Sequence, residues 1–179
     1  MNERHYIEGC KQHDRISQEK LYRQFYPALF ALCKTFFDDN QEIVTAINNG
    51  MLKVFKNIEQ YDEEKGTFFN WVYTVVRNAA LTEIRNKKTS VSLSYIGTIP
   101  DTASFNPFEE KEWERVYEML HRLPVTTRAV CNLYYNEGFS IKEIAASLEM
   151  KEGTVKWHLN EGRTRLKNIF TPNFSKSEG

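Results

Sequence analysis

Apolar residues recur three or four positions apart through most of the chain, which is the spacing of an amphipathic helix. Three such stretches, over 22–36, over 44–58 and from Phe68 onward, predict three helices in the first half. Pro27 lies inside the first stretch, where we expect a kink or a break because proline removes a backbone hydrogen bond. Gly66 marks a loop before the third helix. No β-hairpin signal is found, so the pattern predicts an all-α protein.

The helical spacing is lost over 89–107. Seven of these 19 residues are Ser or Thr, with a glycine and two prolines among the rest. This composition is typical of a linker. We therefore expect two small helical domains, 1–88 and 108–179, joined by an extended linker.

The second domain carries a helix-turn-helix pattern. Ser140 opens a short helix, and Glu143 completes a capping box three residues later. After a turn over 150–153, apolar spacing predicts a second helix over about 154–169. Gly162 falls on the inner face of that helix, where a small residue permits close packing.

The second helix of such a unit enters the major groove of DNA with its N-terminal residues at the base edges. The residues expected to face outward there are Lys156, Trp157, His158 and Asn160. Lysine suits phosphate or guanine, histidine and asparagine can bond base edges, and tryptophan offers apolar contact. Further along, Arg163, Arg165 and Lys167 suit phosphates. The alternative is a plain helical hairpin whose charges form a solvated face.

The charges balance overall but not locally. Lys plus Arg is 24 and Asp plus Glu is 24, which argues against a generic nucleic-acid coat. Over 77–88 four basic residues face one acidic residue, and over 151–167 five face two. Acidic residues gather over 59–65 and over 109–118. The chain thus carries two basic patches separated by acidic stretches, and its function has to account for this arrangement.

The sequence indicates a cytoplasmic protein without membrane insertion. Its 179 residues suit one ordinary domain or two small ones. The run over 27–33 is the longest apolar one, far below the roughly 20 residues that span a bilayer. The first residues lack the apolar core of a signal peptide. The three cysteines are far apart and odd in number, so no disulfide framework is expected.

No pattern for catalysis, a cofactor or a metal is found. The four histidines accompany no nucleophile, and no phosphate-binding loop is present. His5, Cys10 and His13 offer only three donors with no fourth nearby, and we expect a disordered N-terminus there instead. We therefore expect a protein that is not an enzyme.

Residues 123–167 closely resemble the C-terminal promoter-binding domain of bacterial sigma factors of the extracytoplasmic-function (ECF) group. The similarity lies in Leu123-Pro124, Gly138-Phe139-Ser140, Glu143-Ile144-Ala145, Gly153-Thr154-Val155-Lys156 and Arg163-Thr164-Arg165-Leu166. Residues 21–34 and 51–89 resemble the opening helices and following core of the same family. The most characteristic pieces there are Gly66-Thr67-Phe68, Trp71-Val72 and Arg77-Asn78-Ala79-Ala80-Leu81. The chain is identified as a member of this group.

The resemblance implies that the first domain docks on the polymerase and captures the −10 promoter element as a single strand. Docking on the β′ coiled coil falls to the helix over 42–58, through Thr45, Asn48, Asn49, Leu52 and Lys53. The family usually has an acidic residue and a glutamine where this chain has Thr45 and Asn48. The −10 reader is expected on the loop 59–67 and the helix after it, through Trp71, Arg77, Asn78, Arg85, Lys87 and Lys88. Trp71 at this spacing is alternatively a core residue.

The resemblance places the −35 reader over 152–163. Its expected DNA contacts are Thr154, Lys156, Trp157, His158, Asn160, Arg163 and Arg165. The family often has arginine at the positions of His158 and Glu161, and a small polar residue at Trp157. The tryptophan at this position implies a distinctive −35 sequence.

The implied function is to bind core RNA polymerase and direct it to promoters of a regulated stress, envelope or nutrient-uptake regulon. The implied partners are core polymerase (β′ coiled coil and β), promoter DNA and a membrane-anchored anti-sigma factor. Two alternatives remain: a stand-alone helix-turn-helix regulator, and an interaction protein that keeps the fold without reading DNA. Transcription in vitro with core polymerase separates all three.

Overall fold

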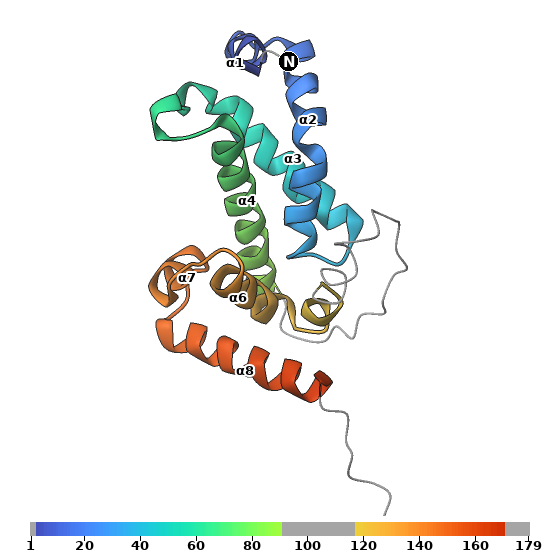
Figure 1. The fold of residues 1–179 in the computed structure, drawn as a ribbon, viewed down its shortest axis with the longest axis vertical. Helices are drawn as coiled ribbons and strands as arrows, with labels where there is room; N and C mark the ends of the chain where they lie inside the picture. The colour runs from blue at the N-terminus through green and yellow to red at the C-terminus, as the bar shows by residue number, and fades with distance from the viewer. Residues whose placement is uncertain (1–2, 91–116, 171–179) are drawn as a thin grey trace, which may run out of the picture. The chain divides into compact units, whose positions relative to one another are not determined.

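The computed structural model describes residues 3–90 and 117–170. Every regular element within these ranges is helical, which confirms the all-α prediction. The chain divides into two compact units, 1–87 and 88–179, which are described separately (Figure 1). The last helix of the first unit extends to Ser90, two residues into the predicted linker, and the rest of 89–107 lies outside the described residues.

The described part of the first unit, from residue 3 onward, contains four helices and two short 3-10 turns. They are α1 (Glu3–Lys11), α2 (Arg15–Lys34), α3 (Asn40–Lys56), η1 (Ile58–Gln60), η2 (Glu63–Lys65) and α4 (Phe68–Ser90). Helix α2 packs against α1 and α3. Asp14 and Asp39 cap the N-termini of α2 and α3, each accepting hydrogen bonds from two backbone amides.

Helix α1 shows that the expected disorder at the N-terminus is wrong. Ile7 and Cys10 are buried, and α1 packs on α2 and η1. The approach is close, since a Cβ on Gly9 would lie 2.2 Å from Ser17 Oγ. A helix this short owes its stability to packing rather than to its own propensity, so its local sequence gives little signal.

Pro27 does not break α2, which continues from Arg15 to Lys34. Proline removes only the bond to the carbonyl four residues earlier. Pro27 is exposed, so solvent can hydrate that carbonyl, while Leu21, Phe25 and Leu29 keep one buried face along the helix.

Helices α3 and α4 meet closely at Gly50. A Cβ at this position would lie 2.8 Å from Cα and Cγ2 of Val76. Both residues are buried, so glycine sets the distance between the helix that precedes the 59–67 loop and the helix that follows it.

The second unit contains the predicted helix-turn-helix. Residues 117–121 are helical, followed by α6 (Val125–Tyr135), α7 (Ile141–Ser147) and α8 (Glu152–Phe170). Helices α6 and α7 both pack on α8. The capping box of Ser140 and Glu143 is present, with the Ser140 amide donating to Glu143 Oε2 at 2.8 Å.

Two buried features join the helices of this unit. Gly162 lies on the inner face of α8 as predicted, and a Cβ there would lie 2.5 Å from Cys131 Sγ on α6. The buried guanidinium of Arg128 donates to the carbonyls of His121 and Leu123, each at 3.2 Å, and so ties α6 to the preceding helical turn. In the described ranges, no helix is both long and apolar enough to cross a membrane.

Candidate nucleic-acid interfaces and docking face

One line of α8 faces directly away from its buried side. Val155, Leu159 and Gly162 are buried against the unit. On the opposite side, Gly153, Trp157, Asn160 and Thr164 follow one another at intervals of four, three and four residues, and all are exposed. We call these four residues the outward line. Trp157 is its largest member, with 58% of its surface exposed.

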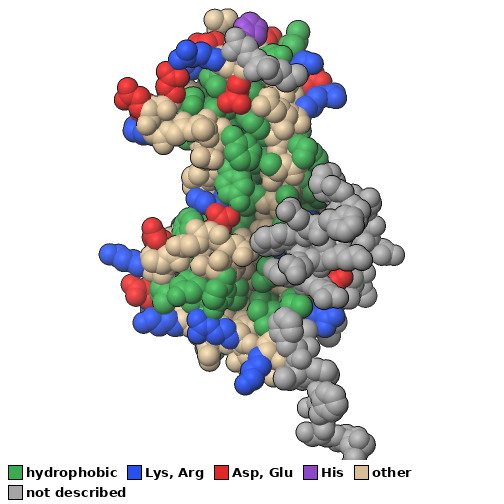
Figure 2. All heavy atoms as spheres, viewed as in Figure 1, with side chains coloured by type: hydrophobic (Ala, Val, Ile, Leu, Met, Phe, Trp, Pro, Cys, Tyr) green, Lys and Arg blue, Asp and Glu red, His purple; other side chains and the backbone are tan. Residues whose placement is uncertain are grey.

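The two edges that flank the outward line carry different charge. Lys156, Arg163 and Lys167, spaced by seven and four residues, share one edge and are exposed. On the other edge Arg165 Nε donates to Glu161 Oε1 at 2.5 Å. Figure 2 shows Lys and Arg side chains gathered along α8. Of the predicted phosphate contacts, Lys156 and Arg163 therefore lie together, whereas Arg165 is paired with an acidic neighbour.

Arg163 is held by Tyr135 at the end of α6. Its Nε donates to the tyrosine hydroxyl at 2.6 Å, and its Cζ lies 5.9 Å from the centroid of the ring. This hydrogen bond raises the pKa of Arg163 above its usual value, so the side chain stays charged. The sequence analysis did not single out Tyr135. This side chain is 52% exposed, and the spacing of apolar residues cannot show that it is exposed.

The prediction that His158 faces outward is wrong in its orientation. The ring is half-buried, and its Nδ1 lies 2.9 Å from Oγ1 of the buried Thr127 on α6. Position 158 borders the buried face of α8, and the contact with Thr127 keeps the ring against α6 instead of in solvent. Thr154 is also half-buried, at the start of the helix.

On α4, three of the predicted −10 residues lie on one face. Trp71, Asn78 and Arg85 are spaced by seven residues, close to two helical turns. Asn78 is exposed, whereas Trp71 is half-buried, its ring centroid 5.7 Å from that of Phe68 and 5.9 Å from that of Tyr61. Trp71 thus belongs to an aromatic cluster at the edge of the core. This position is intermediate between the two predictions for it, a core residue and an exposed residue of the −10 reader.

The loop over 59–67 is built by local hydrogen bonds. Asp62 accepts from the backbone amide of Glu64 at 3.0 Å, and the Tyr61 hydroxyl donates to the carbonyl of Gly66 at 3.1 Å. Gly66 has a φ of 143°, a conformation that residues with a side chain rarely adopt. Figure 2 shows acidic side chains around this part of the first unit.

The basic residues of α4 do not form one track. Lys87 pairs with Glu42 on α3 and lies 5.5 Å from the centroid of the Phe37 ring. Arg85 Nη2 donates to Thr82 Oγ1 at 3.2 Å, and Arg77 is half-buried. The side chain of Lys88 lies outside the described residues. Lys87 therefore joins α4 to α3 within the unit.

The predicted docking residues form one exposed face of α3. They are Thr45, Asn48, Asn49, Leu52 and Lys53. Leu52 is 51% exposed, an apolar side chain at the middle of a polar face. Neighbouring helices hold two of the amides: Asn48 Oδ1 accepts from the Tyr22 hydroxyl at 2.8 Å, and Asn49 Nδ2 donates to Glu83 at 3.0 Å.

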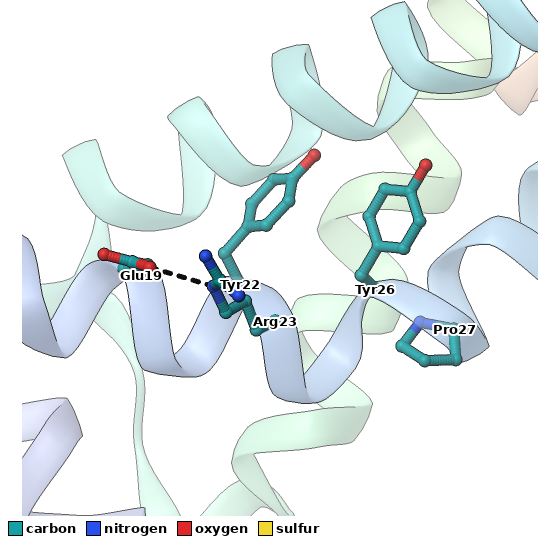
Figure 3. Close-up of a pocket in the computed structure, with 5 residues that line it drawn as sticks. All are labelled: Glu19, Tyr22, Arg23, Tyr26 and Pro27. Atoms are coloured by element: carbon teal, nitrogen blue, oxygen red, sulfur yellow. Dashed lines mark ion pairs between the residues drawn. The ribbon is translucent and has the colours of Figure 1, made fainter.

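A surface pocket on α2 continues this face. It is lined by Glu19, Tyr22, Arg23, Tyr26 and Pro27 (Figure 3). The rings of Tyr22 and Tyr26 lie side by side, with centroids 5.6 Å apart. Sequence reasoning assigned docking to α3 alone and missed these tyrosines, although their spacing of four residues beside Pro27 placed both on one face of α2.

The described residues contain no group of three His, Cys, Asp or Glu side chains that could hold a metal ion. The three cysteines are buried as free thiols. Burial raises the pKa of the Cys33 thiol to about 12, so this side chain is a poor nucleophile at neutral pH.

Two regions of one protein family match the two units. Sigma-70 region 2 matches residues 21–89, and Sigma-70 region 4 matches residues 113–166. The chain therefore belongs to the sigma-70 family, and it is an RNA polymerase sigma factor of the ECF group. Both regions occur in family order, which supports the sigma-factor reading over a stand-alone regulator.

Individual relatives agree with this assignment. RNA polymerase sigma factor SigZ of Bacillus subtilis is 26% identical over 84% of this chain and 85% of its own length. ECF RNA polymerase sigma factor SigE of Mycolicibacterium smegmatis is 24% identical over 90% of this chain, which spans 64% of that relative. Among solved structures, the sigma factor RpoE in complex with the anti-sigma factor NepR from Bartonella quintana has a TM-score of 0.50 and 17% identity, covering 87% of this chain and 97% of that one. This last likeness concerns the fold alone.

Proposed function

We propose that this sigma factor contacts core polymerase through the exposed face of α3, captures the −10 element with α4 and reads the −35 element with α8. The observation that supports this most directly is the arrangement of α8. Its outward line carries the exposed side chains of Trp157, Asn160 and Thr164, and one flanking edge carries the exposed basic residues Lys156, Arg163 and Lys167. A recognition helix needs both, because phosphate contacts position the helix and base contacts specify the sequence.

For the −10 element, the supporting feature is the face of α4 with Trp71, Asn78 and Arg85. Single-stranded DNA requires a stacking surface, base-edge donors and positive charge. The exposed amide of Asn78 can bond a base edge, and Arg85 lies two turns further along the same face.

For core polymerase, the supporting feature is an exposed apolar side chain within a polar helix face. Leu52 would be the buried centre of an interface, and Asn48, Asn49 and Lys53 its rim. Tyr22 and Tyr26 extend the face onto α2.

We place the two domains at 1–88 and 108–179, with a linker between them, and assign an anti-sigma factor anchored in the membrane as the inhibitory partner. What supports an anti-sigma partner is the structural likeness to RpoE, a sigma factor solved in complex with the anti-sigma factor NepR. Limited proteolysis tests the domain boundaries. Cuts should concentrate over 89–107 and leave two stable fragments, whereas cleavage within 20–85 would contradict them.

The central experiment is transcription in vitro with purified core polymerase and a promoter selected by the holoenzyme. The wild-type chain should confer promoter-specific initiation. Asn78→Ala should retain duplex binding but lower permanganate reactivity at the −10 thymines. Normal melting by this variant would remove Asn78 from the −10 site, and absence of initiation with wild type would overturn the proposed function.

A further inference from the structure

The outward line of α8 contains a large apolar side chain where a DNA-reading helix ordinarily presents polar ones. Trp157 is the sixth residue of α8, within the N-terminal part that lies deepest in a major groove. Gly153, one turn before it, has no side chain, and no atom lies within 4 Å of a Cβ built there. The indole therefore stands clear of its own helix on that side.

The Trp157 ring contacts His158, which in turn contacts a buried residue of α6. The centroid of the Trp157 ring lies 4.8 Å from that of His158, edge to face. His158 Nδ1 lies 2.9 Å from Thr127 Oγ1, and Thr127 is buried on α6. A side chain restricted in this way loses less conformational freedom on binding.

The chemistry of the groove limits what a fixed indole can read. Beside their hydrogen-bonding groups, guanine, adenine and cytosine present only ring C–H on the major-groove edge, whereas thymine presents a C5 methyl group. Burying the indole face against polar edges would leave those edges without their water partners, at a cost in free energy. Against a methyl group, both surfaces gain from leaving water.

The exposed residues on either side of Trp157 are polar. Lys156 on the basic edge and Asn160 one turn further along are exposed and polar, so they can supply hydrogen bonds to flanking base pairs. Trp157 lies between them, and apart from the single N–H donor of its indole its surface is apolar.

The geometry points to Trp157 as the residue that makes −35 recognition depend on a thymine methyl group, with His158 and Thr127 as its positioning residues. This inference rests on the proposed function, because it requires α8 to lie in the −35 major groove.

The test begins with selection. Holoenzyme containing wild-type chain or Trp157→Ser is used to select duplexes from a library randomised across the −35 segment. Wild type should enrich a thymine at one position that Trp157→Ser no longer enriches, while the rest of the motif persists. The indole is exposed, so the variant should fold normally, which an unchanged melting temperature would verify.

The second step removes only the methyl. The selected duplex is prepared with deoxyuridine in place of that thymine, which leaves every hydrogen-bonding group in place. Wild-type holoenzyme should bind it about fourfold more weakly, the effect of one buried methyl group. Trp157→Ser should bind both duplexes equally. Thr127→Val, which keeps the branched shape but lacks the hydroxyl, should show a smaller penalty than wild type.

The outcomes separate the two levels of inference. A holoenzyme that selects no upstream motif overturns the proposed function and this inference with it. A holoenzyme that selects a motif in which every thymine tolerates deoxyuridine leaves the proposed function standing and overturns the role of Trp157. A methyl penalty that persists in Trp157→Ser assigns the contact to another residue and has the same consequence.

Discussion

Arg163 and Tyr135 form a fixed pair on the surface of the second unit, with the arginine Nε donating to the tyrosine hydroxyl at 2.6 Å. The Nε of the guanidinium is occupied by this hydrogen bond. The bond also fixes the plane of the guanidinium and so the directions in which the two terminal nitrogens can donate. Planar, oriented guanidinium groups suit bidentate contacts to phosphate.

This pair gives a prediction about promoter affinity. Arg163→Ala should weaken holoenzyme binding to the −35 duplex uniformly across sequences and lower the salt slope by about one. Tyr135→Phe should have a smaller effect in the same direction, and none in the Arg163→Ala background. Binding isotherms at several salt concentrations measure both. A change in base preference would contradict a role confined to phosphate.

Glu161 gives a prediction of opposite sign. Its carboxylate accepts from Arg165 at 2.5 Å and lies beside the outward line. Glu161→Gln should strengthen binding to promoter DNA and steepen its salt dependence, because it removes a repulsive charge and releases an arginine for phosphate. The same binding isotherms test this. Weaker binding limited to duplexes with cytosine at one position would show instead that Glu161 accepts from a base.

The exposed leucine of α3 gives a prediction for the docking face. Leu52→Ala should weaken binding to core polymerase by about 1–3 kcal/mol without changing the melting temperature, since the side chain is exposed in the free protein. The matched control is Ile16→Ala on α2, which is also apolar and 68% exposed but lies outside the predicted face. Equal losses in both variants would remove the special role of Leu52.

The contact between α6 and α8 gives a prediction for stability. Gly162→Ala should lower the free energy of unfolding by about 1–3 kcal/mol, because its Cβ would overlap Cys131 Sγ. Gly153→Ala on the same helix is the control, since nothing crowds its Cβ and stability should be unchanged or higher. Adding Cys131→Ala to Gly162→Ala should recover part of the loss. Urea denaturation measures these three variants and Cys131→Ala alone, and additive effects of Gly162→Ala and Cys131→Ala would contradict direct overlap.

The capping box gives a prediction for pH. The Ser140 hydroxyl, followed by the Ser140 amide, lowers the pKa of Glu143 from its usual 4.5 by hydrogen bonding to the carboxylate. A lowered pKa means that this stabilisation is fully present above the unfolded value and is lost as the pH falls through the lower folded value. Glu143→Gln should therefore reduce the difference in stability between about pH 7 and about pH 3. An unchanged pH profile of urea denaturation would contradict this.

The sequence predicted the elements whose signals are local. The capping box of Ser140 and Glu143 and the inward position of Gly162 need only the spacing along one helix, and both are present. The same holds for the exposed stripe of α3, which is the complement of its apolar pattern.

The remaining features depend on partners distant in sequence. Helix α1 is stabilised by α2, and His158 is drawn inward by Thr127, 31 residues earlier. Lys87 was expected at DNA but pairs with Glu42, 45 residues away. Periodicity identifies which face of a helix is buried, but residues at the border of that face are decided by what the neighbouring helix offers.

The pairing of Lys87 and Arg165 with glutamates affects how the protein would search a genome. A bacterial chromosome offers millions of competing sites, so the ratio between specific and non-specific binding matters more than the affinity itself. Cations already neutralised within the fold contribute little to binding arbitrary duplex. A zero net charge therefore leaves recognition to a few base contacts, and a sigma factor of this kind should spend little time on DNA that is not a promoter.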